Sequence, residues 1–131
     1  MNNTSNNSNA AGITTANRAP NVDVWVDTIN MARDNGGRPG EDASSFAPGD
    51  RTIYCIIHLN LAKTGTVVRF VWEGIEGPRI TQIVTTDYTT KALENVVTGH
   101  ATYNGDWPKG SYRVVIYING ALDKMIYYTI E

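Results

Sequence analysis

The chain of 131 residues, 41% of them hydrophobic, is long enough for one domain with a buried core. Its 11 basic and 13 acidic residues leave a net charge of -2 without long runs of one sign, so binding to nucleic acid or to an anionic membrane is not expected. The single cysteine excludes an intramolecular disulfide and a metal site built from cysteines.

The amino-terminal segment differs from the rest of the chain. Residues 1–20 are rich in Asn, Ser and Thr, so we expect a solvated tether ahead of one domain over residues 21–131. We expect no transmembrane segment, because no apolar run approaches the roughly 18 residues required, and the polar start does not resemble a signal peptide. Alternatively, residues 12–16 form an extended strand that adds to a neighbouring subunit's sheet edge, giving a homo-oligomer or donor-strand fibre.

The first strand of the domain is predicted from valines that alternate with polar or aromatic residues, namely Val22, Val24 and Val26. Ile29 and Met31 continue this alternation in the opposite phase. The change of phase predicts a β-bulge or a change of sheet near residues 27–28.

A loop and four further strands are predicted next. Residues 34–45 collect Gly, Pro, Asp and Ser, which predicts a long exposed loop that ends at Phe46, whose ring plugs one end of the core. Beyond it, alternating apolar residues predict strands separated by breaks at residues 63–65 and 74–78, with at most one helical turn near residues 87–92. These strands cover residues 51–61, 66–73, 79–86 and 91–103.

A closing β-hairpin is the clearest element, because two β-branched and aromatic runs flank an Asn-Gly pair at residues 119–120. A two-residue loop pairs Ile118 with Ala121 and mixes apolar and charged residues on each face. A three-residue loop, with Gly120 as a bulge, pairs Tyr117 with Ala121; we predict this loop, because burial of several side chains outweighs the preference between turn types. Its apolar face would hold Tyr112, Val114, Ile116, Leu122, Ile126, Tyr128 and Ile130.

Short strands of alternating period, separated by turns, predict an all-β fold: an antiparallel β-sandwich of seven to eight strands. The core between its sheets is predicted to contain Ile53, Cys55, Ile57, Val68, Phe70, Trp72, Val114 and Ile116. Cys55 is expected to be a small, buried and unreactive side chain.

This arrangement resembles an immunoglobulin-like sandwich. Cys55 and Trp72 stand on the predicted second and third strands, and Gly110-Ser111-Tyr112-Arg113-Val114 stands where the family has Gly or Ala-x-Tyr-x-Cys. The resemblance implies that Tyr112 forms a tyrosine corner. Val114 takes the place of the second cysteine, so the inter-sheet disulfide of the family cannot form.

About two thirds of the chain is also similar to small immunoglobulin-like domains of bacterial secreted proteins and lipoproteins. The similar runs include DRTIYC at residues 50–55, Val71-Trp72 and WPKGSYRV at residues 107–114. This resemblance implies an extracellular or cell-surface location, with the leader as the tether of a cleaved or lipid-anchored amino terminus. It implies no catalytic activity.

No pattern in the sequence points to catalysis, a cofactor or a metal. His58 and His100 are predicted on outward faces of separate strands, whereas zinc requires three or four convergent ligands. Ser111 begins a strand and lies in no nucleophile elbow. Asp34, Asn35, Glu41 and Asp42 could offer oxygen ligands to calcium, but they lack the ordered spacing of a calcium loop, so a solvated loop is favoured over a calcium site.

The chain carries more aromatic residues than the core requires. Most are expected to cover strands in half-buried positions, but flat amphipathic rings also suit a surface that binds a sugar chain or another protein. The candidate interaction surface comprises Trp25, Tyr54, Tyr103, Tyr117 and Tyr127. The sequence thus favours a non-enzymatic structural or interaction module of the cell envelope with a protein or glycan partner. A carbohydrate-binding module and a fibre subunit are alternatives, and a hydrolase has the least support.

Overall fold

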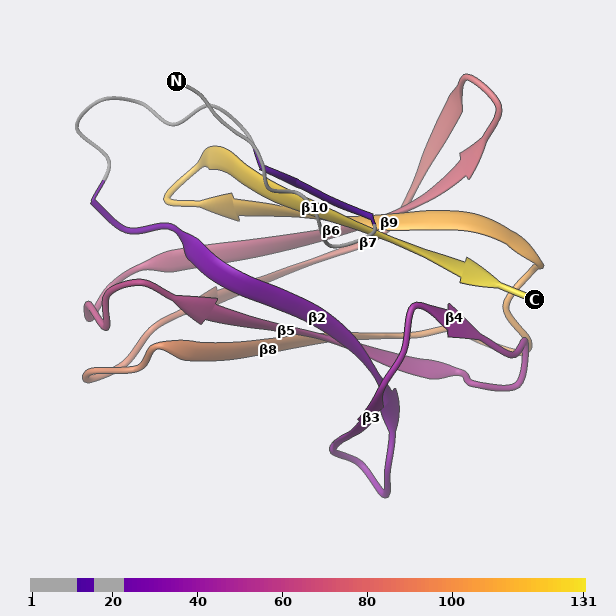
Figure 1. The fold of residues 1–131 in the computed structure, drawn as a ribbon, viewed down its shortest axis with the longest axis horizontal. Coiled ribbons are helices and arrows are strands. Elements are labelled where there is room, and N and C mark those ends of the chain that lie inside the picture. Colours follow the sequence, from indigo (N-terminus) through magenta and orange to yellow (C-terminus); the bar gives the residue numbers. More distant parts are fainter. Residues whose placement is uncertain (1–11, 16–22) are drawn as a thin grey trace.

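The computed structural model describes residues 12–15 and 23–131, which form two stacked β-sheets (Figure 1). The six-stranded sheet has the order β1 (Ile13–Thr15), β10 (Ala121–Ile130), β9 (Gly110–Ile118), β6 (Val67–Glu76) and β7 (Arg79–Thr89), with β4 (Ser45–Phe46) beside β10. The four-stranded sheet has the order β3 (Pro39–Asp42), β2 (Val26–Asp34), β5 (Thr52–Leu59) and β8 (Val96–Thr102). Every pairing is antiparallel except that of β4 with β10.

The predicted all-β sandwich is confirmed, and Cys55 is a free, buried thiol. The seven long strands correspond to the seven predicted ones, and the short strands β1, β3 and β4 are additional. Residues 87–92 contain no helical turn, within the expected limit of one, because β7 continues to Thr89. The strand predicted from residue 91 begins only at Val96. Residues 12–15 and 23–131 contain no helix that could span a membrane.

The core lies between the two sheets, and all eight predicted core residues are buried in it. At one end, the ring of Phe46 packs edge-on against Tyr128 with 5.8 Å between ring centroids, which confirms the predicted plug. Trp107 lies edge-on to the rings of both Tyr112 and Tyr128. This aromatic cluster fixes the end of the sandwich from which the candidate site is built.

The bulge predicted in the first strand is confirmed. The pairing of β2 with β5 shifts by one residue between Val26 and Thr28. The shift keeps apolar residues of both phases on the inner side of the sheet. The buried residues of this segment are Val24, Val26, Ile29 and Met31.

Residues 34–45 are largely exposed, as predicted, but the prediction of one long loop is wrong, because the segment contains β3 and the start of β4. β3 pairs antiparallel with β2, and β4 pairs with the end of β10. Asn35 N–H donates to the Arg38 carbonyl at 2.7 Å and closes the turn before β3, while Arg33 forms an ion pair with Glu41 on β3. A short, polar edge strand has no apolar alternation, so the sequence pattern could not reveal it.

The turn between β9 and β10 also differs from the prediction. Ala121 pairs with Ile118 across a two-residue turn, in which Asn119 has φ 50° and Gly120 has φ 85°. Positive φ at both central residues is the signature of a type I′ turn. The Asn119 side-chain oxygen accepts a hydrogen bond from Val67 N–H at 2.9 Å and ties the turn to β6.

A bulge at Asp123, inside β10, restores the predicted apolar face. The register shifts between Leu122 and Lys124, so the predicted apolar residues face the core, except that Leu122 is 38% exposed. The Asp123 carboxylate is only 3% exposed and accepts a hydrogen bond from Val26 N–H at 2.9 Å, which joins the two sheets. Burial therefore does decide the register, but through a bulge beyond the turn rather than within it.

β1 pairs antiparallel with β10 of its own chain. Lys124 Nζ donates to Thr15 Oγ1 at 2.8 Å, and Tyr127 N–H donates to the Gly12 carbonyl at 2.8 Å. The segment considered as a strand for a neighbouring subunit thus covers a sheet edge within its own chain. The rest of the predicted tail, residues 1–11 and 16–20, lies outside the described residues.

Candidate interaction surface

β7 is a free edge of the six-stranded sheet, because it pairs with β6 on one side and no described strand lies on the other. None of its 11 residues is buried. Its sequence, RITQIVTTDYT, is rich in β-branched residues and contains neither Lys nor Pro, which commonly protect sheet edges, although its register with β6 shifts once near Ile83. Such an edge presents unpaired backbone N–H and C=O groups to which another strand can add.

The ends of β6 and β7 form an arm, residues 73–82, that projects from the sandwich at the upper right of Figure 1. Glu76 pairs with Arg79 across a turn of Gly77, with φ 61°, and Pro78. Gly adopts this φ without the steric cost of a Cβ. The predicted break over residues 74–78 is therefore too long, since β6 continues to Glu76.

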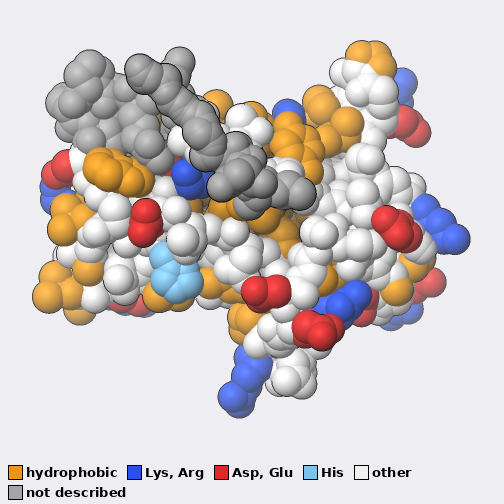
Figure 2. Space-filling model, in the orientation of Figure 1, with side chains coloured by type: hydrophobic (Ala, Val, Ile, Leu, Met, Phe, Trp, Pro, Cys, Tyr) orange, Lys and Arg blue, Asp and Glu red, His pale blue; other side chains and the backbone are white. Residues whose placement is uncertain are grey.

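Charged side chains of both signs lie close together on the surface. Figure 2 shows acidic and basic groups interspersed on the face in view rather than gathered into a patch of one sign. On the outer face of the six-stranded sheet, Arg113 Nε lies 2.7 Å from Glu73 Oε1, and Arg69 binds Asp87 through two hydrogen bonds of 2.8 and 3.1 Å. Hydrogen bonding to Glu73 raises the pKa of Arg113, and hydrogen bonding to Arg69 lowers the pKa of Asp87.

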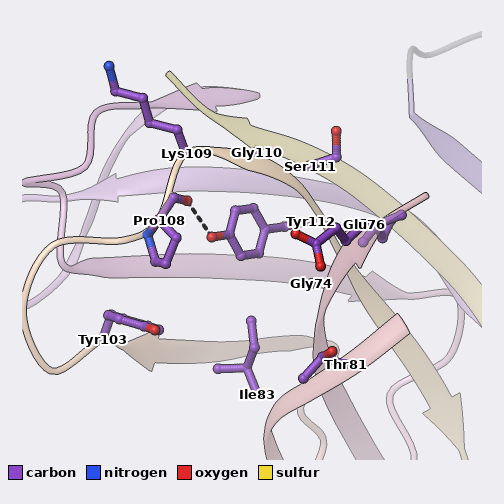
Figure 3. Close-up of a pocket in the computed structure, with 11 residues that line it drawn as sticks. Gly74, Glu76, Thr81, Ile83, Tyr103, Pro108, Lys109, Gly110, Ser111 and Tyr112 are labelled. Carbon is purple, nitrogen blue, oxygen red and sulfur yellow. Dashed lines mark hydrogen bonds between the residues drawn. The ribbon is translucent and has the colours of Figure 1, made fainter. Parts of the chain in front are cut away.

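A groove of about 340 Å³ lies at the base of the arm (Figure 3). Ile83 of β7 contributes to one side, and Tyr103 and Pro108 contribute from the connection between β8 and β9. The charged residues of the lining, Glu76 on the arm and Lys109 before β9, have no ion-pair partner in the described part of the chain. The groove thus combines apolar walls with charges of both signs.

Hydrogen bonds and ring contacts hold the wall of the groove formed by the β8–β9 connection. The Tyr112 hydroxyl donates to the Pro108 carbonyl, as the dashed line in Figure 3 shows, and burial raises the pKa of Tyr112. Trp107 Nε1–H donates to the Arg51 carbonyl at 3.0 Å, and the Tyr103 ring packs on Trp107 with 4.9 Å between centroids. This side of the groove is therefore preformed.

The five aromatic residues of the predicted interaction surface do not gather into one patch. Trp25 precedes β2 and is half-buried, while Tyr117 and Tyr127 lie on the outer face of the six-stranded sheet. Tyr54 lies on the outer face of the four-stranded sheet and is 7% exposed. Only Tyr103 lines the groove.

The three acidic residues of the segment 34–42, Asp34, Glu41 and Asp42, accept hydrogen bonds from groups of the protein itself. Asp34 accepts hydrogen bonds from the Tyr54 hydroxyl at 2.8 Å and from Gly37 N–H at 3.1 Å. Asp42 accepts one from the Asn30 side chain at 2.8 Å. The carboxylates thus hold β3 and the adjoining turn in place through these hydrogen bonds.

The two histidines are exposed on the outer face of the four-stranded sheet, as predicted. His58 pairs with Thr28 and Val96, whereas His100 pairs with Tyr54, which lies four residues before His58 on β5. Among residues 12–15 and 23–131, no three His, Cys, Asp or Glu side chains converge as metal ligands.

Neither the groove nor the free edge was predicted from the sequence. The groove joins residues 74–83 with Tyr103 and residues 108–112, and no local pattern reveals such a meeting of distant segments. The one signal for the edge was the scarcity of large apolar residues at alternate positions of β7.

No protein-family model and no curated protein sequence matches the chain.

Proposed function

We propose that the chain is a non-enzymatic, extracellular or cell-surface interaction module of immunoglobulin-like type, and that it binds another protein through β7. The immunoglobulin-like assignment is supported by the hydrogen bond from the Tyr112 hydroxyl to the Pro108 carbonyl, which has the form of a tyrosine corner. It is also supported by Trp72, which pairs with Val114 in the buried centre of the six-stranded sheet. The location is supported by the resemblance to domains of secreted proteins and lipoproteins.

The free edge β7 is the observation that carries the proposed function. Its 11 residues offer a longer stretch of unpaired backbone than the other edge strands do: β8, at the edge of the four-stranded sheet, has 7 residues, β3 has 4 and β1 has 3. Main-chain hydrogen bonds to an added strand give affinity without requiring any particular side chain on β7. A carbohydrate-binding function has less support, because the candidate aromatic residues lie on different faces.

Site-specific photo-crosslinking in cells that make the protein natively tests this proposal. We place a photoreactive phenylalanine at Gln82 or Thr85 of β7 and, as a matched control, at His58 on the outer face of the four-stranded sheet; all three positions are exposed. His58 lies on β5, which is paired on both sides. We expect one discrete protein adduct from the β7 positions and none from His58. Equal labelling from all three positions, or no adduct from β7, contradicts the proposal.

A further inference from the structure

The groove lies directly beside the free edge. Thr81 and Ile83 belong to β7 and also line the groove. A strand that adds to β7 extends the six-stranded sheet by about 4.8 Å, and its alternate side chains point to the side of the sheet on which the groove lies. One of these side chains is then next to the groove.

We infer that the groove selects the partner of β7: an extended peptide segment that adds to this strand and inserts one large apolar side chain, of the size of Leu or Phe, into the groove. This inference rests on the proposed function, since it assigns a specificity site to the same binding edge. In strand addition generally, backbone hydrogen bonds supply affinity and pockets for alternate side chains supply specificity.

The lining of the groove favours an apolar side chain. Ile83, Pro108 and the ring of Tyr103 supply apolar surface, and the volume of about 340 Å³ falls at the lower end of the roughly 300–1,000 Å³ typical of ligand sites. The charged residues of the lining, Glu76 and Lys109, are both exposed, and the Lys109 side chain points away from the groove in Figure 3. A carboxylate or ammonium group inserted into the groove therefore loses hydration without a buried counter-ion in the lining.

The same lining is poorly suited to a sugar ring. Tyr103 is the only residue of the predicted aromatic surface that reaches the groove, and Trp107 packs on its ring. The Tyr112 hydroxyl is already bound to the Pro108 carbonyl. A peptide can also form backbone hydrogen bonds with the unpaired edge of β7 at the border of the groove. A saccharide has no peptide backbone with which to add a strand to this edge.

Fluorescence anisotropy with a panel of labelled peptides tests the inference on the full chain. The probes are nine-residue peptides of alternating Thr and Val with a central guest residue: Ala, Leu, Phe, Glu or Lys. Burial of the guest side chain in an apolar groove predicts that the Leu or Phe peptide binds about tenfold more tightly than the Ala, Glu or Lys peptides. Equal affinities across the panel overturn the inference.

Two matched variants locate the effect. Thr81→Trp fills the groove, whereas Thr85→Trp places the same side chain on the same strand opposite Val71, facing the outer side of the sheet. We expect Thr81→Trp to abolish the tenfold preference and Thr85→Trp to preserve it, with unchanged thermal midpoints showing that both variants fold. A preference that survives in Thr81→Trp overturns the assignment of the groove.

Amide hydrogen exchange separates failure of this inference from failure of the proposed function. If all peptides bind with equal affinity and still slow exchange in residues 79–89, β7 is the binding edge and only the role of the groove in selecting the peptide is overturned. Peptides that bind without protecting β7, or that do not bind, overturn both. Cellohexaose and chitohexaose serve as saccharide probes, and binding of either that is lost in Thr81→Trp also overturns the inference.

Discussion

Tyr128 is a buried polar side chain in the middle of the aromatic cluster, and its hydroxyl has no hydrogen-bond partner in the described part of the chain. Burial of a hydroxyl removes its hydrogen bonds to water, and without a partner in the protein this cost is not compensated. We therefore expect Tyr128→Phe to keep the free energy of unfolding or to raise it by up to about 1 kcal/mol. Urea denaturation followed by tryptophan fluorescence measures this change.

Tyr112→Phe is the matched comparison, because Tyr112 lies in the same cluster but donates to the Pro108 carbonyl. Loss of this hydrogen bond in Tyr112→Phe should lower the free energy of unfolding by about 0.5–1.5 kcal/mol. If Tyr128→Phe lowers the stability as much as Tyr112→Phe does, the Tyr128 hydroxyl has a stabilising partner and the prediction is wrong.

Cys55 gives the stability a dependence on pH above neutrality. Burial raises the pKa of its thiol, whereas an unfolded thiol ionises near about pH 8.5. Above that pH the unfolded state holds fewer protons than the native state, so stability falls as the pH rises. We expect a loss of about 2 kcal/mol between pH 8 and pH 10 from this residue.

The control is Cys55→Val, a substitution of similar size in the same apolar site. Urea denaturation at several pH values should show a clearly smaller slope between pH 8 and pH 10 in Cys55→Val than in the natural sequence. Unfolded tyrosines ionise near about pH 10, so the raised pKa values of Tyr112 and Tyr128 act mainly above this window. Equal slopes in the two proteins would exclude Cys55 as the source.

Single residues were predictable from the sequence when they were apolar and stood in an alternating run, as Val68, Phe70 and Trp72 do. Asp123 was not predictable, because its burial depends on accepting a hydrogen bond from Val26, 97 positions away. A period of two identifies the face of a strand, but it cannot reveal a polar partner on another sheet.

At the scale of the element, close contact between the sheets depends on Gly99 of β8. A Cβ at this position would lie 2.8 Å from two atoms of the Phe70 ring on the opposite sheet, which is closer than real contacts allow. Gly99→Ala should therefore lower the free energy of unfolding by about 1–3 kcal/mol, since overpacking forces the ring or the backbone to move. Thermal and urea denaturation both report this loss.

Gly49→Ala is the control for the general effect of replacing Gly by Ala. No atom lies within 4 Å of a Cβ at Gly49, so this substitution should be neutral or stabilising by about 0.4–1 kcal/mol. Similar losses in the two variants would show that contact with Phe70 is not the cause.

Most long strands were predictable because they carry several alternating apolar residues, whereas β3 and β4 depend on pairing and side-chain contacts that no local pattern displays. The turn after β9 illustrates a second limit. The apolar face required one extra residue in the hairpin, and a bulge in the turn or in β10 meets that requirement equally well. Only the buried Asp123 decides between them.

At the scale of the whole molecule, the two sides of the six-stranded sheet differ in whether a further strand covers the long strand there. β1 covers the β10 edge from within the chain, while the β7 edge has no covering strand among the described residues. The sandwich was predictable from the sequence, but which edge stays open was not, because edge position follows from strand order rather than from the composition of any one strand.

Removal of residues 1–18 tests whether β1 serves its own chain or a neighbouring one. Ile13 is half-buried against the core, and Thr15 binds Lys124, so the truncated protein should lose about 1 kcal/mol of stability. Because β1 pairs with β10 of the same chain, we expect the mass in solution to correspond to the same number of subunits before and after truncation. Light scattering coupled to size exclusion measures the mass.

Ile13→Ser in the full chain is the control, and should lower stability with no change in subunit number. Fewer subunits after truncation would instead mean that residues 1–18 link copies of the chain, as in a donor-strand fibre.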